Sequence, residues 1–260
     1  MRVDVFLAAS GYAKSREAAK RLIEAGRVSI DGKAVAKASE NVDETAEHDV
    51  EITETDEFVS RGGLKLEAAL DAFKINVTGM RAVDIGASTG GFTDCLLRRS
   101  AAFVYAVDSG HGQLDERLCR DGRVANIEGF NARQLCEGNL GGIGAQLDIA
   151  VMDVSFISQT YILPGISNLL KSGGVLVSLI KPQFEAGRAA VGKGGIVKHK
   201  QDRLAAVRRV MDCAAASGFG YIGLITSPIT GGDGNVEYLL AVRQGDDTAF
   251  PDARSIGRLI

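Results

Sequence analysis

The sequence lacks several features that would assign it to a membrane or secreted class. Its 260 residues contain no apolar run long enough to span a membrane. The N-terminal residues carry charge at Arg2 and Asp4 and have no long apolar core, so we expect no signal peptide. Together these absences predict a cytoplasmic protein. The length suffices for one large domain and one small one.

The sequence also has little that could bind a metal ion or form a disulfide. The three histidines form no cluster, and no C-x-x-C pair occurs among the four cysteines, Cys95, Cys119, Cys136 and Cys213. We therefore predict no metal site and no disulfide framework. The cysteines are interpreted as small buried apolar residues.

The most informative stretch, Ala82 to Phe92, reads A-V-D-I-G-A-S-T-G-G-F. Its apolar run predicts a buried strand, its glycines predict a turn, and residues 93–99 can form the next helix. Strand, glycine turn and helix in this order build the nucleotide site of doubly wound α/β domains. A second predicted strand, 104–107, ends in Asp108, where an acid can accept hydrogen bonds from both ribose hydroxyls.

The same turn indicates which nucleoside to expect. It reads G-x-x-x-G-G, which is neither the dinucleotide fingerprint nor the phosphate loop, and Asp84 would repel a pyrophosphate but attract an ammonium. S-adenosylmethionine carries a ribose and an amino acid but no phosphate, so it fits best. A glycine turn without a ligand is the alternative. The candidate cofactor contacts are Asp84, Gly86, Ala87, Ser88, Thr89, Gly90, Gly91, Phe92, Asp108, Asn131 and Asp153.

The first sixty residues are divided in charge. Residues 2–37 hold eight basic residues against four acids, whereas residues 39–57 hold nine acids and no Lys or Arg. Periodicity predicts one helix around residues 3–7 and a second that Ser15 caps and Gly26 ends. A hairpin turn at Asp31-Gly32 follows, and the predicted strands are 28–30, 33–35 and 50–52.

Two helices and a hairpin, with basic residues on the second helix, suit binding to phosphates of folded RNA. A solvated charged face is the alternative. The pattern S-R-E-A-A-K-R-L-I-E-A-G-R-V-x-I-D-G-K resembles the RNA-binding domain named after ribosomal protein S-four, over about residues 2–52. That family binds structured RNA, which favours RNA binding here. The candidate RNA contacts are Arg2, Lys14, Arg16, Lys20, Arg21, Arg27, Lys33 and Arg61.

The rest of the chain predicts an α/β fold, a Rossmann-like sheet of seven strands. We divide the chain into a small α+β RNA-binding domain at 1–55, a linker at 56–59 and a catalytic domain at 60–260. Later strands are expected at 124–127, 148–152, 174–180, 221–226 and 238–242. Helices are expected at 113–118, at 156–170 with an interruption near Pro164, and at 201–217. The glycine-rich segment 184–195 is predicted to be a mobile loop over the site.

Four ionisable residues lie at the ends of these elements. Asp153 and Lys181 directly follow two predicted buried strands, which places both at the ligand-binding edge of the sheet. Lys65 begins a helical stretch, and Glu237 begins the last strand. Their order and placement resemble the lysine, aspartate, lysine and glutamate set of FtsJ-type ribose methyltransferases. Surface ion pairs are the alternative interpretation.

This resemblance implies a specific chemistry. A ribose 2′-hydroxyl is a weak acid and must lose its proton as it attacks a methyl group. A lysine can accept that proton only if its pKa is lowered, which repulsion between Lys65 and Lys181 could cause. Asp153 and Glu237 would orient the amines and the hydroxyl.

Several stretches together resemble the TlyA family, sometimes labelled hemolysin A, over nearly the full length. They are R-V-D-V-F-L, V-S-R-G-G-L-K-L, D-I-G-A-S-T-G-G-F-T-D-C-L-L, V-M-D-V-S-F-I-S and L-I-K-P-Q-F-E. The family implies methyl transfer from S-adenosylmethionine to the 2′-hydroxyl of cytidines in ribosomal RNA. Members that modify both subunits tend to have a longer basic N-terminus, whereas this chain begins at Met1-Arg2-Val3. We therefore expect large-subunit RNA alone as the substrate.

Two other classes of function compete with this one. A lytic protein, which the family's second name suggests, needs an apolar or strongly amphipathic membrane segment, and the sequence has neither. A non-enzymatic RNA-binding protein would have lost the four-residue set, which is intact. The prediction is an enzyme whose partner is ribosomal RNA or a ribosomal subunit, without membrane insertion.

Overall fold

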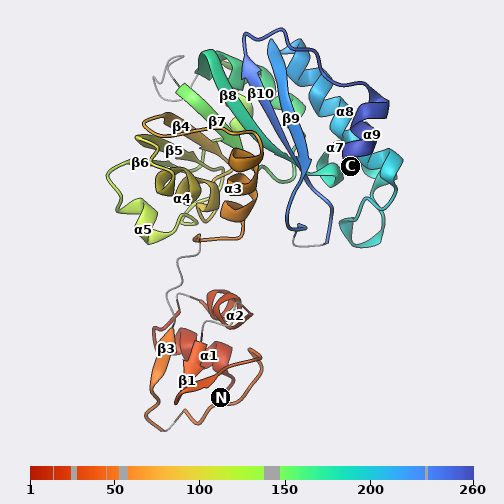
Figure 1. The fold of residues 1–260 in the computed structure, drawn as a ribbon. Helices are drawn as coiled ribbons and strands as arrows, with labels where there is room; N and C mark the ends of the chain where they lie inside the picture. Colours follow the sequence, from red (N-terminus) through yellow and green to blue (C-terminus); the bar gives the residue numbers. More distant parts are fainter. Residues whose placement is uncertain (14, 25–27, 45, 53–57, 138–146, 232–233) are drawn as a thin grey trace. The chain divides into compact units, whose positions relative to one another are not determined.

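In the computed structural model the chain divides into two compact units, Met1–Glu57 and Phe58–Ile260. The structure describes all residues except 14, 25–27, 45, 53–57, 138–146 and 232–233, and only the backbone of residues 21, 24, 136 and 137. The helices and strands of both units are drawn in Figure 1. Among the predicted RNA contacts, Lys14, Arg27 and the side chain of Arg21 lie outside the described residues.

The N-terminal unit contains two helices and a small antiparallel sheet that share one core. Its strands lie in the order β2-β1-β3. The turn between β1 and β2 has positive φ at both Asp31 and Gly32, as this residue pair predicts. Buried Leu7, Ala19 and Ile23 pack against the strands. The elements are α1 (Val3–Ala9), α2 (Arg16–Glu24), β1 (Val28–Ile30), β2 (Lys33–Ala34) and β3 (Val50–Ile52).

The larger unit contains one seven-strand sheet, as the sequence predicts. Its order is β6-β5-β4-β7-β8-β10-β9, and β10 is antiparallel to both neighbours while the other pairs are parallel. The chain builds outward from β4 to β6 and then returns to the other side of β4. The strands are β4 (Arg81–Ile85), β5 (Phe103–Val107), β6 (Val124–Ile127), β7 (Leu147–Met152), β8 (Leu170–Ile180), β9 (Phe219–Thr226) and β10 (Tyr238–Gln244). This reversal places a ligand crevice at the carboxyl ends of β4 and β7.

Helices cover both faces of this sheet (Figure 1). Because successive strand residues point to opposite faces, Val83 and Ile85 belong to one buried core and Ala82 to the other. The first core includes residues of α6 (Leu163–Leu169), α8 (Lys200–Ala216) and α9 (Ala253–Leu259), and the second includes residues of α3 (Gly62–Ala72) and α4 (Gly91–Arg98). Burial on both faces explains the continuous apolar runs of the strands.

Several segments differ from the sequence-based expectation. In place of one helix over 156–170 there is a 3-10 turn, η2 (Gln159–Tyr161), followed by α6, with Pro164 in the first turn of α6, where proline is well tolerated. The helix predicted over 113–118 is the single turn α5 (Glu116–Cys119). The segment predicted as a loop contains α7 (Pro182–Glu185) and two 3-10 turns, η3 (Arg188–Ala190) and η4 (Lys193–Gly195).

Two further observations concern the cysteines and the search for membrane-spanning helices. Cys95 is buried as interpreted, but Cys119 is exposed, so that interpretation is wrong for Cys119. Within the described residues, no helix has the length and apolar character needed to cross a membrane.

Candidate active site

A cavity at the carboxyl ends of β4, β7 and β8 contains most of the predicted catalytic and cofactor residues. Its wall includes the glycine turn after β4, the segments that follow β7 and β8, and the start of α3. The predicted residues that line it are Arg61, Lys65, Asp84, Gly86, Ala87, Ser88, Thr89, Gly91, Phe92, Asp153 and Lys181. The fold therefore brings together residues that are far apart in the sequence.

Two glycines of the turn are required by the close approach of neighbouring segments. Gly86 has a φ of 83°, and a Cβ there would lie 2.5 Å from the carbonyl oxygen of Asp153. A Cβ at Gly91 would collide with the side chain of Ser60 and lie 2.9 Å from the backbone nitrogen of Gly63. Any larger residue at either position would push apart two walls of the cavity.

Gly90 and Asn131 do not belong to the cavity wall. Gly90 has a φ of 95°, and a Cβ there would point at Leu114 and Leu118 rather than at the cavity. Glycine is therefore needed at position 90 for its left-handed backbone and for the close approach of the two leucine side chains. The side chain of Asn131 accepts a hydrogen bond from the backbone N–H of Arg133 at 3.0 Å, so it stabilises a turn.

Asp84 is a buried acid with one unsatisfied oxygen. Its Oδ2 accepts hydrogen bonds from the backbone N–H and the hydroxyl of Thr93, at 2.9 and 2.7 Å. Its Oδ1 is buried and has no hydrogen-bond partner within the described part of the chain. Burial raises the pKa of Asp84 to about 7, and the charge of Asp153 adds to the effect. Since Asp84 lines the cavity, a cationic donor bound there could satisfy Oδ1.

Asp108 directly follows β5 and stabilises the glycine turn through a hydrogen bond to its backbone. Its carboxylate accepts hydrogen bonds from the backbone N–H groups of Ser88 at 2.8 Å and Gly110 at 2.7 Å. A carboxylate oxygen can accept more than one hydrogen bond, so these contacts leave capacity for a ligand hydroxyl. Asp108 does not itself line the cavity.

Lys181 and Asp153 form an ion pair at the edge of the sheet. Lys181 directly follows β8, and Pro182 begins α7 after it, so its backbone is held on both sides. The Lys181 Nζ lies 2.5 Å from Asp153 Oδ1 and donates a hydrogen bond to the Ser155 hydroxyl at 3.0 Å. Their side chains are 13% and 23% exposed, so the pair is accessible from the cavity.

Lys65 and Glu237 form a second, more deeply buried pair. Lys65 lies in the first turn of α3, and Glu237 directly precedes β10. The Lys65 Nζ lies 2.6 Å from Glu237 Oε2, and the glutamate side chain is only 2% exposed. A Cβ at Gly231 would lie 2.6 Å from Glu237 Oε1, so the backbone at Gly231 packs against this carboxylate.

The two pairs differ from the expected arrangement in one respect. Lys65 and Lys181 line the same cavity, as predicted, but each amine contacts a carboxylate. Repulsion between the two lysines is therefore offset by two negative charges. Each carboxylate contacts one of the two amines in the described structure.

Comparison with known proteins identifies the family. Residues 58–244 match the model of the FtsJ-like methyltransferases, and residues 1–48 match the S4 domain. This chain belongs to the FtsJ-like methyltransferases. It is 44% identical over 249 residues to the 16S/23S rRNA (cytidine-2′-O)-methyltransferase TlyA of Mycobacterium tuberculosis, covering 96% of this chain and 92% of that one. It is 32% identical over 257 residues to the 23S rRNA (cytidine-2′-O)-methyltransferase TlyA of Campylobacter jejuni, with coverages of 92% and 97%.

A solved structure is similar over the full length. A protein from Streptococcus thermophilus described as a candidate hemolysin matches with a TM-score of 0.76 and 40% identity, covering all of this chain and 94% of that one. These matches confirm the predicted resemblance to the TlyA family and the predicted enzyme class.

Two residues at or beside the cavity were not predicted as site residues from the sequence. Ser155 contacts the Lys181 amine and lies two positions after Asp153, and that proximity is the only signal in the sequence. The next residue, Phe156, is 92% exposed and has a φ of 64°, which is uncommon for a bulky residue. Its ring lies 5.2 Å from that of Phe184, between ring centroids.

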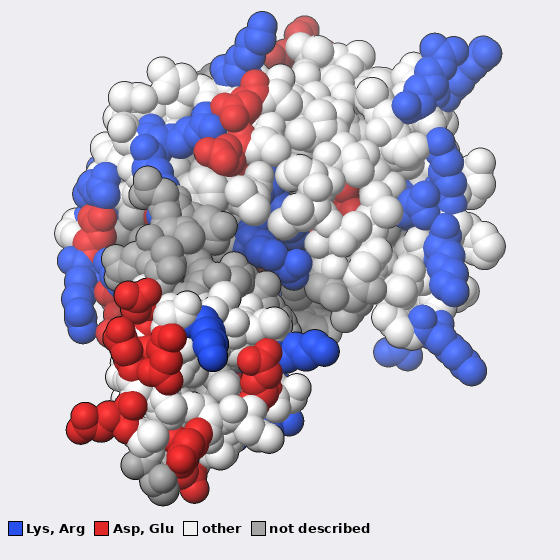
Figure 2. Space-filling model, turned by 60° about the horizontal axis from the view of Figure 1, so that its bottom comes forward, with Lys and Arg blue, Asp and Glu red and all other residues white. Residues whose placement is uncertain are grey.

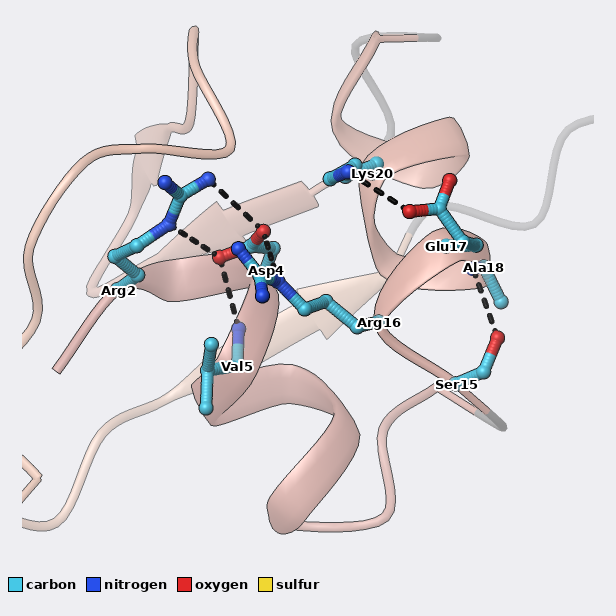
Figure 3. Close-up of polar contacts among 8 residues, drawn as sticks. All are labelled: Arg2, Asp4, Val5, Ser15, Arg16, Glu17, Ala18 and Lys20. Carbon is cyan, nitrogen blue, oxygen red and sulfur yellow. Dashed lines mark hydrogen bonds and ion pairs between the residues drawn. The ribbon is translucent and has the colours of Figure 1, made fainter.

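In the S4 domain, two predicted RNA contacts converge on a buried acid (Figure 3). Asp4 is fully buried and accepts hydrogen bonds from Arg2 Nε at 2.9 Å and from Arg16 Nε at 2.8 Å. The two guanidinium groups hold the pKa of Asp4 far below its usual range. Arg2 and Arg16 are nevertheless 43% and 51% exposed, so each has surface left for a ligand.

The remaining described RNA candidates have different surroundings. Lys20 pairs with Glu17 at 2.8 Å on the surface of α2, as Figure 3 shows. Lys33 is exposed on β2. Arg61 belongs to the methyltransferase unit, precedes α3 and lines the cavity. Ser15 accepts a hydrogen bond from the backbone N–H of Ala18, which confirms the predicted helix cap.

Proposed function

We propose that this methyltransferase transfers a methyl group from S-adenosylmethionine to the ribose 2′-hydroxyl of a cytidine in ribosomal RNA. One observation carries the proposal: two Lys–carboxylate pairs and a glycine turn of the nucleoside-binding type line or adjoin one cavity. The turn can hold a nucleoside, and the amines can act on a hydroxyl proton. Relatives whose names contain this activity match nearly the whole chain.

The residues around the glycine turn fit S-adenosylmethionine as the methyl donor. The unsatisfied Oδ1 of Asp84 can accept a hydrogen bond from the ammonium of its amino acid. Asp108 can accept hydrogen bonds from the ribose hydroxyls. When bound, this cofactor supplies a methyl group on a positively charged sulfur. The chain's own residues must then remove one proton from the acceptor.

Lys181 is the proposed base for that proton. Asp153 Oδ1 lies 2.5 Å from its amine, and the Ser155 hydroxyl accepts a hydrogen bond from it, so both residues hold the amine at the cavity where a 2′-hydroxyl can approach it. The proton would pass from the 2′-oxygen to Nζ as the methyl group moves from the sulfur to that oxygen, which breaks one carbon–sulfur bond and forms one carbon–oxygen bond. Lys65, fixed by Glu237, is proposed to donate a hydrogen bond to the ribose and align the attacking oxygen.

Phe156 is the proposed platform for the base of the target nucleotide. Its exposed ring lies three residues after Asp153 and rests beside Phe184. Sequence-specific RNA-binding proteins commonly stack unpaired bases on such aromatic rings. A ribose inside a paired stem is hard to reach, so a stacking surface beside the catalytic lysine would stabilise the unstacked nucleotide.

Large-subunit RNA is the proposed substrate, and the S4 domain is the proposed anchor for it. The name of the Mycobacterium relative includes 16S and 23S RNA, and that of the Campylobacter relative includes 23S RNA alone. The 23S RNA is therefore common to both. Arg2, Arg16 and Lys33 offer exposed donors for its phosphates. We infer a cytoplasmic location from that substrate.

The direct test uses small and large ribosomal subunits, and RNA stripped from each, prepared from cells that lack this enzyme. Each is incubated with the protein and labelled S-adenosylmethionine, digested to nucleosides and analysed by mass spectrometry. The proposal expects 2′-O-methylcytidine in large-subunit material. A methyl group on a base atom, or no transfer to either subunit, would contradict it, and label in the small subunit would correct the substrate range.

A further inference from the structure

A second basic surface lies on the methyltransferase unit, outside the cavity. We call it the 188–200 surface, after the segment that carries it. Between Glu185 and Asp202 the sequence contains no acid. The segment carries four exposed cationic side chains, Arg188, Lys193, Lys198 and Lys200. Within the part of the chain that the structure describes, none of these four forms an ion pair.

Cations elsewhere on the same unit are arranged differently. Between residues 91 and 130 every cationic side chain is paired with an acid, and these are Arg98, Arg99, Arg117, Arg120 and Arg123. In Figure 2, blue and red side chains alternate on the left of the unit, whereas the right-hand edge shows Lys and Arg without Asp or Glu among them. That edge is the side on which Figure 1 draws α7 and α8. The four unpaired cations of the 188–200 surface thus contrast with the five paired arginines of residues 91–130.

The 188–200 surface is connected to the acceptor side of the cavity at both ends. The short helix α7 joins the start of this segment to Lys181, because α7 begins directly after Lys181 and ends at Glu185. Near its other end, the side chain of buried Asn235 accepts a hydrogen bond from the Val197 N–H at 3.0 Å and donates one to the Gly195 carbonyl at 2.9 Å. Asn235 lies two residues before Glu237. Both ends thus attach to segments that carry proposed catalytic residues.

We propose that the 188–200 surface binds the phosphate backbone of the substrate RNA beside the target nucleotide, as a second RNA contact separate from the S4 domain. The inference rests on the proposed function. Cations without acid partners can contact phosphates without first breaking an ion pair, and each contact releases condensed counterions. Arg188 also lines one hollow with Phe156 and Phe184, so a base stacked there would bring its own phosphates to this surface.

RNA fits this surface better than the other common polyanion, an anionic membrane. Membrane-binding surfaces combine cations with large apolar side chains that enter the lipid. Within the described residues from 187 to 200 no large apolar side chain is exposed, and the exposed ring beside this segment, that of Phe156, lies in the hollow that Arg188 also lines. A phosphate backbone requires only cations and hydrogen-bond donors, which this segment offers.

The test compares two variants with the same change of charge. Lys198→Gln/Lys200→Gln removes two unpaired cations from the surface, and Arg117→Gln/Arg120→Gln removes two exposed cations that are paired with acids. Binding of large-subunit RNA is measured against salt concentration, together with single-turnover methyl transfer at saturating RNA. Affinity for S-adenosylmethionine, measured by calorimetry, checks that both variants are folded.

We expect the first variant to bind RNA several-fold more weakly and to lower the log–log salt slope by about 1.4 to 1.8, at ~0.7 to ~0.9 per lost phosphate contact. Its transfer rate at saturating RNA and its cofactor affinity should equal those of the wild type. The control should keep the wild-type slope. Adding Arg188→Gln and Lys193→Gln to the first variant should about double the loss of slope.

Three outcomes distinguish the alternatives. Equal RNA affinity and salt slope in the two double variants would overturn the proposal. It would also be overturned if the wild type bound vesicles of phosphatidylcholine and phosphatidylserine and the first variant lost that binding but not RNA binding. Absence of methyl transfer by the wild type would contradict the proposed function alone, since RNA binding and its salt dependence are measured separately.

Discussion

The two halves of the cavity are built in different ways. The cofactor half is a short continuous stretch, the glycine turn after β4, whose shape depends on backbone conformation and one buried acid. The acceptor half is assembled from side chains of separate elements, and the paired Lys65 and Glu237 are 172 positions apart. We conclude that cofactor binding depends mainly on the local conformation of one turn. Methyl transfer depends on how the sheet and α3 position side chains that are far apart in the sequence. Damage to one half should spare the function of the other.

Lys181→Ala is expected to give the largest difference between the effect on methyl transfer and the effect on cofactor binding. Removing the proposed base should reduce methyl transfer by about 10² to 10⁴ or more, while affinities for cofactor and RNA stay within about twofold, because the loss falls on the transition state. Single-turnover transfer and calorimetry on one preparation measure both quantities. A parallel fall in cofactor affinity would show that the two halves are not separable.

The next largest effect distinguishes two contacts within the cofactor half, the ribose contact of Asp108 and the ammonium contact of Asp84. Asp108→Ala should weaken S-adenosylmethionine and methylthioadenosine alike, by about tenfold or more, since both ligands carry the ribose. Asp84→Asn should weaken only S-adenosylmethionine, because methylthioadenosine has no ammonium. Calorimetry with the two ligands checks this. Equal losses for both ligands in the Asp84 variant would contradict the proposed ammonium contact.

The raised pKa of Asp84, about 7, gives that contact a dependence on pH. Below this value the free carboxyl is mostly neutral, and binding of a cation must release a proton. S-adenosylmethionine affinity should therefore rise with pH between about 5.5 and 7, by at most about tenfold per unit, and level off above 7, before the α-amino group loses its own proton near ~7.7 to ~8.0. Methylthioadenosine affinity should stay flat. The Asp84→Asn variant should show no rise for either ligand.

A smaller effect is expected on the acceptor side for Phe156→Ala. Stacking of one base contributes about 1 to 3 kcal/mol, so the KM for RNA should rise by about 5- to 150-fold, with cofactor affinity unchanged. Phe156→Tyr keeps an aromatic face and should retain near wild-type KM. If the Ala and Tyr variants behave alike, the ring is not a stacking platform.

The smallest effect concerns the S4 domain, where Arg16 is both a structural and a candidate binding residue. Arg16→Ala should lower both RNA affinity and the melting temperature of this domain, because it removes a partner of buried Asp4. Lys33→Ala should lower RNA affinity alone. Because the pKa of Asp4 is depressed, its stabilising contribution is present above its unfolded value of about 4 and is lost as the pH falls below that value. Thermal unfolding at pH 3 and pH 7 measures it.

The same division explains what the sequence could predict. The glycine turn, the Asp31-Gly32 hairpin and the Ser15 cap depend on neighbouring residues, and the structure has them where the pattern predicts. Asp153 and Lys181 could be placed because the topology of parallel strands brings their carboxyl ends to one edge.

Other features depend on contacts that leave no local pattern. The burial of Asp4 beneath Arg2 and Arg16 requires α1 and α2 to pack together, and no pattern near Asp4 in the sequence predicts it. The exposed ring of Phe156 is set by its left-handed backbone, for which phenylalanine gives no signal. The sequence places Gly90 in the predicted turn, but only the fold shows that a side chain there would meet Leu118.

The measurement that tests the account most directly is single-turnover methyl transfer by Lys181→Arg across a range of pH, on a preparation shown to bind S-adenosylmethionine and RNA. A guanidinium keeps its positive charge and can contact Asp153, but it does not give up its proton in this range. The account predicts no transfer by the variant at any pH at which the wild type is active. Near-normal turnover by Lys181→Arg, with the pH profile of the wild type, would contradict it and show that Lys181 acts by charge or position alone.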